Sequence, residues 1–589
     1  MRFLRLVTVT LTIVVGACAF EDRAAHDSAA GSVNGSRVST LADDYVRAVF
    51  AAFPEYATLE GIAGADNAGL TDNSLAAIER WHAIEDSLLT QVRQIDTTSL
   101  AGSDRITFGF LREQLESSVG NRVCRSELWN VSPTYTGWQS VFALLASVQP
   151  VGSADARADA LARARLVPRY LDTEIINLRE GLRLRYTAPK SNVRGVIEQA
   201  DALVAIQPAA SPFYGPATRD STPEFGRELS TIIRNEIRPA IRRYRDFLST
   251  EYLPGAREAI GVSANPDGSA CYRAAVRGYT SLELSAEQIH QTGLEQMARI
   301  QGEAATIAAR SFPGVDPTKL MRTLAEDPQY RFRGRQDVIG AAQSAVDRAE
   351  KAVPQWFGIV PKSKVVIQPY APFQEKAAPG GQYNSASDDG SRPGTYLINT
   401  YQADRQTRAG GLESTAFHET YPGHHLQIAI AKERPGAHPI TRYFSSGAFV
   451  EGWGLYSERL ADEMGLFSGD IDRVGLLSNE ALRAARLVVD AGMHQLGWTR
   501  QRAIDYLIAN TGEERSGAVA EIDRYIAVPG QATSYMIGNL EIRRLREMAQ
   551  RELGPKFDVK AFHDRVLEDG GVTLAMLRAK IERWVGESR

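Results

Sequence analysis

Three histidines and a glutamate lie close together in the C-terminal half of the chain, at His418, Glu419, His424 and His425. The 589 residues contain nine histidines, so three of them within eight positions far exceed the density expected by chance. In the zinc motif His-Glu-x-x-His, one helix face directs both imidazoles at the metal, and the glutamate acts as a general base. The cluster therefore favours hydrolytic metal chemistry over three separate structural histidines.

Pro422 interrupts the spacing of that motif. A proline within a helix has no N–H group and clashes with the carbonyl group four residues earlier, so a regular helix is expected to break here. If Pro422 and Gly423 bulge out, His424 takes the place of the second motif histidine. An unbroken helix would instead favour His425, because seven residues make nearly two turns. The proline favours His424, and His425 remains the alternative ligand.

A zinc site also needs a third protein ligand and an open position for water. Glu451 follows His424 by 27 residues, a separation that suits a neighbouring helix. Its apolar neighbours indicate that it is at least partly buried, and a cation is a good partner for a buried carboxylate. Glu458, two turns further on, is the reserve candidate. For both residues the competing interpretation is an ordinary surface glutamate.

The elements that must position these residues are mostly helices. Ser285 and Gln288 fit a capping box ahead of apolar residues at helical spacing, and similar stripes recur along the chain. The helical periodicity is lost between about 330 and 411, where residues 364–367 and 395–400 predict strands. We therefore expect a mainly α, large helical metallopeptidase-like fold, with one small β-sheet preceding the zinc helix.

The N-terminal residues resemble an export signal. Residues 1–17 combine a basic start with a short apolar stretch, and the small residues before Cys18 resemble a bacterial lipobox. An ordinary secretory signal that contains a cysteine is the alternative. We expect a lipidated Cys18, a flexible tether over 18–37, a helical N-terminal region over 38–330 and a zinc-site region over 331–589, the last two forming one large domain. This predicts a protein exported to the bacterial cell envelope, anchored by lipid and facing the periplasm or cell surface.

Composition excludes several other classes. The chain is 43% apolar and 23% charged, which is typical of globular proteins. Its 67 basic and 71 acidic residues give a net charge of −4 with no long run of one sign, so nucleic acid is not an expected partner. Beyond Cys18, only Cys124 and Cys271 remain. They permit one disulfide in an oxidising compartment, and two buried thiols are the alternative.

Around these residues the chain resembles the bacterial family known as domain of unknown function 885, many members of which are lipoproteins. That family is grouped with the gluzincins, the His-Glu…Glu class of helical zinc metallopeptidases. The resemblance extends over most of residues 40 to 589. The matching segments are His418–Gln427, Glu451–Gly454 with Tyr456 and Glu458, Asp389–Gly394, Asp490 with His494 and Trp498, and Arg524–Tyr525 followed by Pro529–Ala532 and Tyr535.

The resemblance implies further roles. Tyr535 is similar to a late tyrosine that stabilises the oxyanion in related helical zinc peptidases, and His494 is a second candidate. For Tyr535 the competing interpretation is a buried tyrosine whose hydroxyl group is satisfied. For His494 it is an ordinary pair with Asp490 on a helix surface. The predicted strand 395–400, which includes Tyr396, corresponds to a substrate-binding edge strand. Arg392 beside it is a candidate clamp for a substrate carboxylate, or a structural residue of its loop.

These residues together favour a zinc-dependent peptidase that uses metal-activated water and Glu419 as the general base. A zinc amidase or esterase is the alternative enzyme, because the same chemistry serves other carbonyl groups. A non-catalytic metal-binding lipoprotein scaffold is the alternative outside enzymes, although such a protein would need no general base. The sequence leaves the peptide length, exo- or endo-cleavage, the oligomeric state and the metal open, since Mn or Co suits such a site too.

Overall fold

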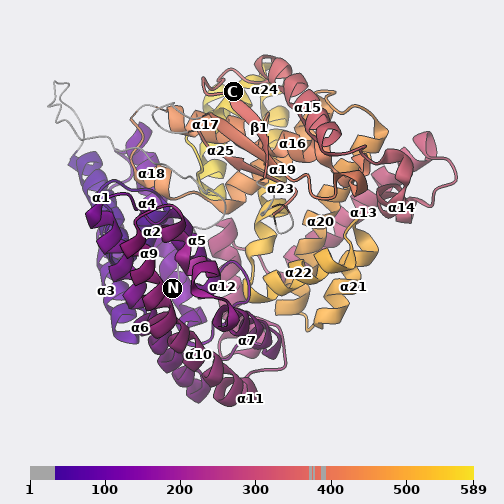
Figure 1. The fold of residues 1–589 in the computed structure, drawn as a ribbon. Helices are drawn as coiled ribbons and strands as arrows, with labels where there is room; N and C mark the ends of the chain where they lie inside the picture. Colours follow the sequence, from indigo (N-terminus) through magenta and orange to yellow (C-terminus); the bar gives the residue numbers. More distant parts are fainter. Residues whose placement is uncertain (1–32, 371–374, 376–377, 387–392, 435) are drawn as a thin grey trace. The chain divides into compact units, whose positions relative to one another are not determined.

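A computed structural model describes residues 33–370, 375, 378–386, 393–434 and 436–589, and helices dominate its ribbon (Figure 1). The described strands form one small sheet, which confirms the predicted mainly α fold. The predicted signal peptide, Cys18 and Arg392 lie outside the described residues. The first helix begins at Val33, so residues 33–37, predicted as the end of the tether, are helical.

The chain forms two compact units that divide between Ala274 and Ala275, called here the N-terminal and the C-terminal unit. This division precedes the boundary expected at residue 331, because the helix that starts at Ala286 packs along α20 (Asp470–His494) of the C-terminal unit. The helices of the N-terminal unit are α1 (Val33–Ala52), α2 (Pro54–Leu59), α3 (Leu75–Val92), α4 (Gly102–Asn121), α5 (Trp138–Val148), α6 (Ala154–Leu184), α7 (Lys190–Ala205), α8 (Gly215–Thr218), α9 (Pro223–Ile232), α10 (Arg238–Phe247), α11 (Leu253–Gly255) and α12 (Gly268–Thr280), which crosses the division.

A disulfide joins Cys124 to Cys271 within the N-terminal unit, across 147 positions of the sequence. Of the two possibilities left open by the sequence, the disulfide is therefore the one found. In the same unit, apolar residues of α6, α9 and α10, such as Leu171, Leu229 and Ile241, form a core with almost no exposed surface. Burial of these helix faces stabilises the unit by roughly 25 cal/mol for each Å² of apolar surface.

The C-terminal unit contains the predicted chemistry. Ser285 caps its first long helix in the capping box that the sequence predicts. The helices are α13 (Ala286–Ser311), α14 (Leu320–Glu326), α15 (Arg335–Trp356), α16 (Leu412–Glu419), α17 (His424–Glu433), α18 (Ile440–Tyr443), α19 (Gly447–Glu463), α20 (Asp470–His494), α21 (Arg500–Asn510), α22 (Arg515–Ala527), α23 (Ser534–Leu553), α24 (Val559–Leu567) and α25 (Leu574–Ser588).

The small sheet consists of β1 (Val365–Pro369), β2 (Gly381–Asn384) and β3 (Gly394–Ile398), in the order β1-β3-β2. The central strand β3 pairs parallel to β1 and antiparallel to β2, with Tyr396 opposite Ile367 and Tyr383. The sequence predicts β1 and β3. It does not predict β2, because this strand lies within a segment rich in Pro, Gly and Ser that reads as a loop.

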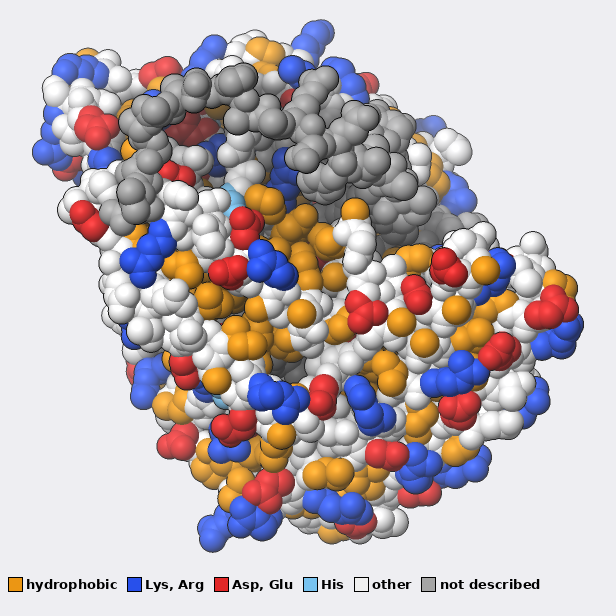
Figure 2. Space-filling model, turned by 90° about the vertical axis from the view of Figure 1, so that its left-hand side faces the viewer, with side chains coloured by type: hydrophobic (Ala, Val, Ile, Leu, Met, Phe, Trp, Pro, Cys, Tyr) orange, Lys and Arg blue, Asp and Glu red, His pale blue; other side chains and the backbone are white. Residues whose placement is uncertain are grey.

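Among the helices that the structure describes, none has both the length and the apolar character needed to cross a lipid bilayer. Basic and acidic side chains alternate over the face drawn in Figure 2, and no large area of it carries a single sign. This pattern agrees with the balanced composition of the sequence.

Candidate metal centre

The segment between α16 and α17 sets the geometry of the histidines. Helix α16 ends at Glu419 and α17 begins at His424, so the helix breaks where Pro422 predicts it. The N–H group of Gly423 donates to the Phe417 carbonyl group at 3.1 Å and closes this turn. A Cβ atom at Gly423 would lie 1.9 Å from the carbonyl oxygen of His418, so the turn requires a glycine here.

This break brings His418 and His424 together with Glu451 of α19. One potential ligand atom from each of the three buried side chains lies within 4.8 Å of those of the other two. Glu451 Oε2 is 3.6 Å from His418 Nε2 and 3.8 Å from His424 Nε2, and the two rings are nearly perpendicular, at 84°. These separations exceed hydrogen-bond length but suit atoms that share one ion at about 2.0–2.2 Å. The three residues predicted as metal ligands therefore converge.

Glu458, the reserve ligand, occupies a different place. Its Oε1 atom lies 2.8 Å from His418 Nδ1, and its Oε2 atom accepts a hydrogen bond from Ser414. Because Nδ1 faces Glu458, the opposite nitrogen of the ring faces Glu451. Carboxylates in this position fix the orientation and tautomer of metal-binding histidines. Glu458 thus positions His418 and is not itself a member of the converging set.

The charges of the cluster favour a cation. Burial lowers the pKa of His418, but the nearby Glu451 and Glu458 carboxylates outweigh it and raise this pKa to about 10. Burial raises the pKa of Glu451, yet the two histidines hold it well below its usual range. Glu419, Glu451 and Glu458 are all buried around two imidazoles. The carboxylates therefore outnumber the imidazoles and attract positive charge, in the form of protons or a metal ion.

His425 lies outside the converging set. Its Nδ1 atom is 2.9 Å from the Tyr383 hydroxyl group, and its Nε2 atom lies 3.2 Å from the Ser363 carbonyl oxygen and 3.1 Å from the Tyr421 hydroxyl group. Burial lowers its pKa to about 4, so the ring is neutral at physiological pH. His425 therefore ties α17 to β2. The geometry selects His424 between the two histidines that the sequence left open.

Glu419, Tyr370 and Tyr396 are buried polar residues, called here the polar wall, and Glu419 directly follows the predicted ligand His418. The Glu419 Oε2 atom is buried and has no hydrogen-bond partner among the described residues, as is also true of the Tyr396 hydroxyl group. Burial and the charge of Glu419 both raise the pKa values of Tyr370 and Tyr396. The two hydroxyl groups therefore lie close enough to Glu419 to respond to its charge.

The predicted edge strand around Tyr396 requires correction. β3 pairs with β1 on one side and with β2 on the other, so its backbone has no free edge for a peptide. Tyr396 itself is fully buried, with its side chain in the polar wall beside Glu419. The sequence could not reveal this, because the unpredicted β2 supplies the second neighbour.

Tyr535 and His494 have different surroundings. Helices α19 and α23 cross closely, since a Cβ atom at Gly452 would lie 2.5 Å from Gly538 Cα. This crossing brings Tyr535 near Glu451: burial first, and then the Glu451 charge, raise the Tyr535 pKa to about 12. His494 is fully buried, and its Nε2 atom lies 3.0 Å from the Tyr525 carbonyl oxygen, which ties α20 to α22.

Gly454 provides the space for the His418 ring. A Cβ atom at this position would lie 2.5 Å from His418 Cε1 and 2.6 Å from Nε2. We therefore expect Gly454→Ala to displace the imidazole and to weaken metal binding by about 10- to 100-fold, as seen when the surroundings of metal ligands are altered. Competition for zinc with a chelating dye measures this change. Gly340→Ala in α15 is the control, because no atom lies within 4 Å of its Cβ position. Equal zinc affinity in both variants would contradict this prediction.

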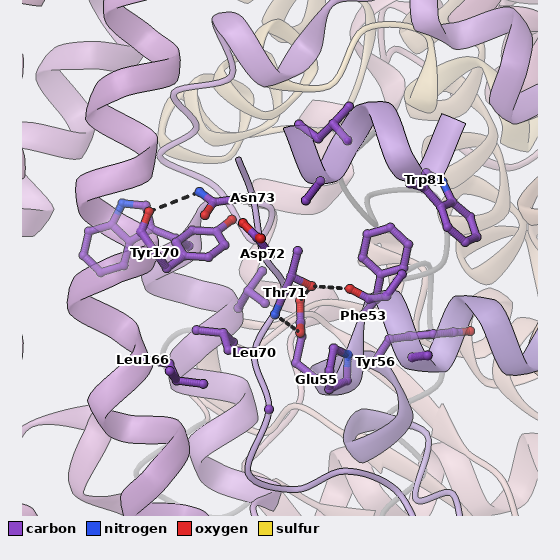
Figure 3. A pocket seen from close by; sticks show the side chains of 18 of the residues that line it. Phe53, Glu55, Tyr56, Leu70, Thr71, Asp72, Asn73, Trp81, Leu166 and Tyr170 are labelled. Atoms are coloured by element: carbon purple, nitrogen blue, oxygen red, sulfur yellow. Dashed lines mark hydrogen bonds between the residues drawn. The ribbon is translucent and has the colours of Figure 1, made fainter. Parts of the chain in front are cut away.

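A cavity of about 650 Å³ lies in the N-terminal unit (Figure 3). Its wall includes aromatic side chains such as Phe53 and Trp81. Its Glu55 carboxylate accepts hydrogen bonds from the backbone N–H group and hydroxyl group of Thr71, at 3.0 and 2.5 Å. Over the described residues, the one set of His, Cys, Asp or Glu side chains arranged to hold a metal ion is that in the C-terminal unit. The predicted metal ligands are therefore not among the residues that line this cavity.

Comparison with known proteins finds one family model and several solved structures that are similar to this chain. A family model described as "Bacterial protein of unknown function (DUF885)" matches residues 54–581. The structure is similar to that of the "putative lipoprotein from Colwellia psychrerythraea", with a TM-score of 0.85 and 26% sequence identity over 94% of this chain and 100% of that chain. It also resembles a "putative lipoprotein of unknown function from Shewanella oneidensis", with a TM-score of 0.77 and 19% identity over 92% of this chain and 99% of that chain, a likeness of fold. No curated protein matches the chain.

Proposed function

Because the chain belongs to the bacterial DUF885 family, whose function is unknown, its activity must be argued from the site, and we propose that it is a zinc-dependent peptidase. The observation that carries this proposal is the convergence of His418, His424 and Glu451 beside the buried Glu419 carboxylate. The order of these residues is similar to that of the gluzincins, in which a later helix supplies the third ligand.

The residues present fit zinc in a catalytic rather than a structural site. Two imidazole nitrogens and one carboxylate oxygen make three protein ligands, whereas structural zinc usually has four. The Glu419 Oε2 atom, buried without a partner among the described residues, supports a reacting group at this point. When bound by His418, His424 and Glu451, zinc would lower the pKa of a water molecule and polarise the scissile carbonyl group.

The protein's own residues supply the other requirements of hydrolysis. Glu419 would accept a proton at its unpartnered Oε2 atom and pass it to the leaving amine. The hydroxyl group of Tyr535 would donate a hydrogen bond to the oxyanion, since its raised pKa keeps it protonated. Glu458 would hold the His418 ring in place through Nδ1.

The location proposed for the protein follows from the N-terminal residues and from its relatives. Both matched structures have lipoprotein in their descriptions. The sequence around Cys18 resembles a lipobox, and a Cys124–Cys271 disulfide fits an oxidising compartment. We place the enzyme in the bacterial cell envelope, held by a lipid on Cys18.

Metal analysis joined to peptide digestion tests the proposed function. We expect the purified protein to hold about one zinc ion per chain and to cleave members of a peptide library. A chelator should stop cleavage, and added zinc should restore it. Cleavage of ester or non-peptide amide substrates alone would favour the alternative hydrolase. A protein that holds zinc tightly but hydrolyses none of these substrates would favour the non-catalytic scaffold, and a protein that binds no zinc would contradict the proposal.

A further inference from the structure

A buried arginine lies behind Tyr535. Arg486 of α20 is 7% exposed, and its guanidinium carbon lies 4.5 Å from the centre of the Tyr535 ring. Its Nε atom donates to the Tyr525 hydroxyl group at 2.7 Å, and its Nη2 atom donates to Glu521 at 3.0 Å. The Nη1 atom is buried and has no hydrogen-bond partner among the described residues. Burial of an unpaired polar group of this kind is costly, so a ligand is expected here.

Two further arginines lie near Arg486. Arg524 donates to the same Glu521 carboxylate at 2.9 Å, so one carboxylate serves two guanidinium groups. Arg483, one turn before Arg486 on α20, has an Nε atom that is also buried without a partner in the described part of the chain. Glu513 also lies near Arg486 and Arg483, and burial together with the Glu521 charge raises its pKa. The Glu521 carboxylate is thus shared by two guanidinium groups, and Arg486 Nη1 still has no partner among the described residues.

Tyr535 contacts Arg486 and also responds to the charge of the predicted ligand Glu451. The charges of Glu451 and of Arg486, Arg524 and Arg483 all act on the Tyr535 hydroxyl group. Arg483 also acts on Glu458, the residue that positions His418. One tyrosine thus separates a predicted metal ligand from an arginine with an unused N–H group.

We propose that Arg486 Nη1, supported by Arg483, binds a carboxylate group of the substrate, and that the enzyme takes peptides by their C-terminal carboxylate. This rests on the proposed function and names its substrate class. Guanidinium groups are the usual partners of carboxylates in proteins, and a charged acceptor removes the cost of the buried N–H group. A carboxylate fixed beyond Tyr535 places the scissile bond near the C-terminus, so the cleavage is that of an exopeptidase.

The test separates binding from turnover. The zinc-loaded Glu419→Gln protein is titrated with an N-dansylated tripeptide as the free acid, as the C-terminal amide, and as an amide with a glutamate side chain. We expect the free acid to bind about 10- to 100-fold more tightly than the plain amide, the range for hydrogen bonds to charged groups. Tight binding by the glutamate-containing amide alone would overturn the assignment of a C-terminal carboxylate. Equal binding of all three would overturn the proposal itself.

Arginine variants identify the group responsible. Adding Arg486→Gln should abolish the preference for the free acid, whereas adding Arg500→Gln should keep it, because Arg500 pairs with Asp523 and does not act on Tyr535. A preference that survives Arg486→Gln would overturn the assignment, since the carboxylate would then bind elsewhere, for instance at the metal. If Arg486→Gln does not fold by circular dichroism, Arg483→Gln is used, and a free-acid preference left unchanged would count against the proposed pair. If no variant binds zinc or cleaves peptides, the same titrations are made without zinc. An Arg486-dependent preference for the free acid would then still stand, so the two proposals fail separately.

Discussion

Replacing either His418 or His424 by alanine is expected to leave the protein without zinc. Each imidazole contributes one of three converging ligand atoms, and the remaining two protein ligands would bind the ion weakly. After dialysis we expect the zinc content to fall from about one ion per chain to less than about a tenth of that. The loss should occur in a folded protein, since each side chain faces the cluster. Metal analysis, with circular dichroism to verify the fold, measures the effect.

The neighbouring histidine provides the matched control. His425→Gln removes an imidazole from the next position of the same helix, where the ring binds Tyr383, Tyr421 and the Ser363 carbonyl group. We expect this variant to keep its zinc, although the loss of those contacts should lower its stability by about 1–3 kcal/mol. Zinc retained by His418→Ala and His424→Ala, or lost only from His425→Gln, would refute the assignment of the ligands.

The parts of the site that could be predicted depend on the properties of single residues and their neighbours in the sequence. Pro422 removes a helical hydrogen bond whatever its surroundings, so the break after Glu419 followed from the residue alone. That break in turn favoured His424 over His425. Glu451 was accessible to the same reasoning, because its apolar neighbours required burial and a buried carboxylate requires a partner.

Contacts between distant segments account for what was not predictable. β2 forms in a segment rich in turn residues because β3 provides its hydrogen-bond partners, and this makes β3 central rather than an edge. The role of Gly454 depends on the position of a ring from another helix. Arg486 is one of three arginines of α20 and stands out by no sequence pattern, and only its unpartnered Nη1 atom beside Tyr535 indicates a site.

Replacing Glu419 by glutamine is expected to separate metal binding from catalysis. The amide keeps the shape of the side chain but cannot accept the proton of the attacking water, so the chemical step loses its base. General acid–base catalysis contributes about 10²–10⁴-fold to rates, and we expect kcat to fall by that factor. Because Glu419 is not among the converging ligand atoms, the zinc content should stay at about one ion per chain.

Zinc content and kcat should be measured in the same preparation. A general base affects kcat alone, whereas a metal ligand affects the zinc content as well. Glu463→Gln is the matched control: it makes the same chemical change on α19, where Glu463 pairs with Arg546 at 2.8 Å and is about half exposed. Such surface pairs contribute about 0–1 kcal/mol to stability, so zinc content and kcat should both remain. A Glu419→Gln protein with full kcat would exclude Glu419 as the base. One that loses its zinc along with its activity would instead make Glu419 a ligand, and the polar wall with Tyr370 and Tyr396 would then need another acceptor for the proton.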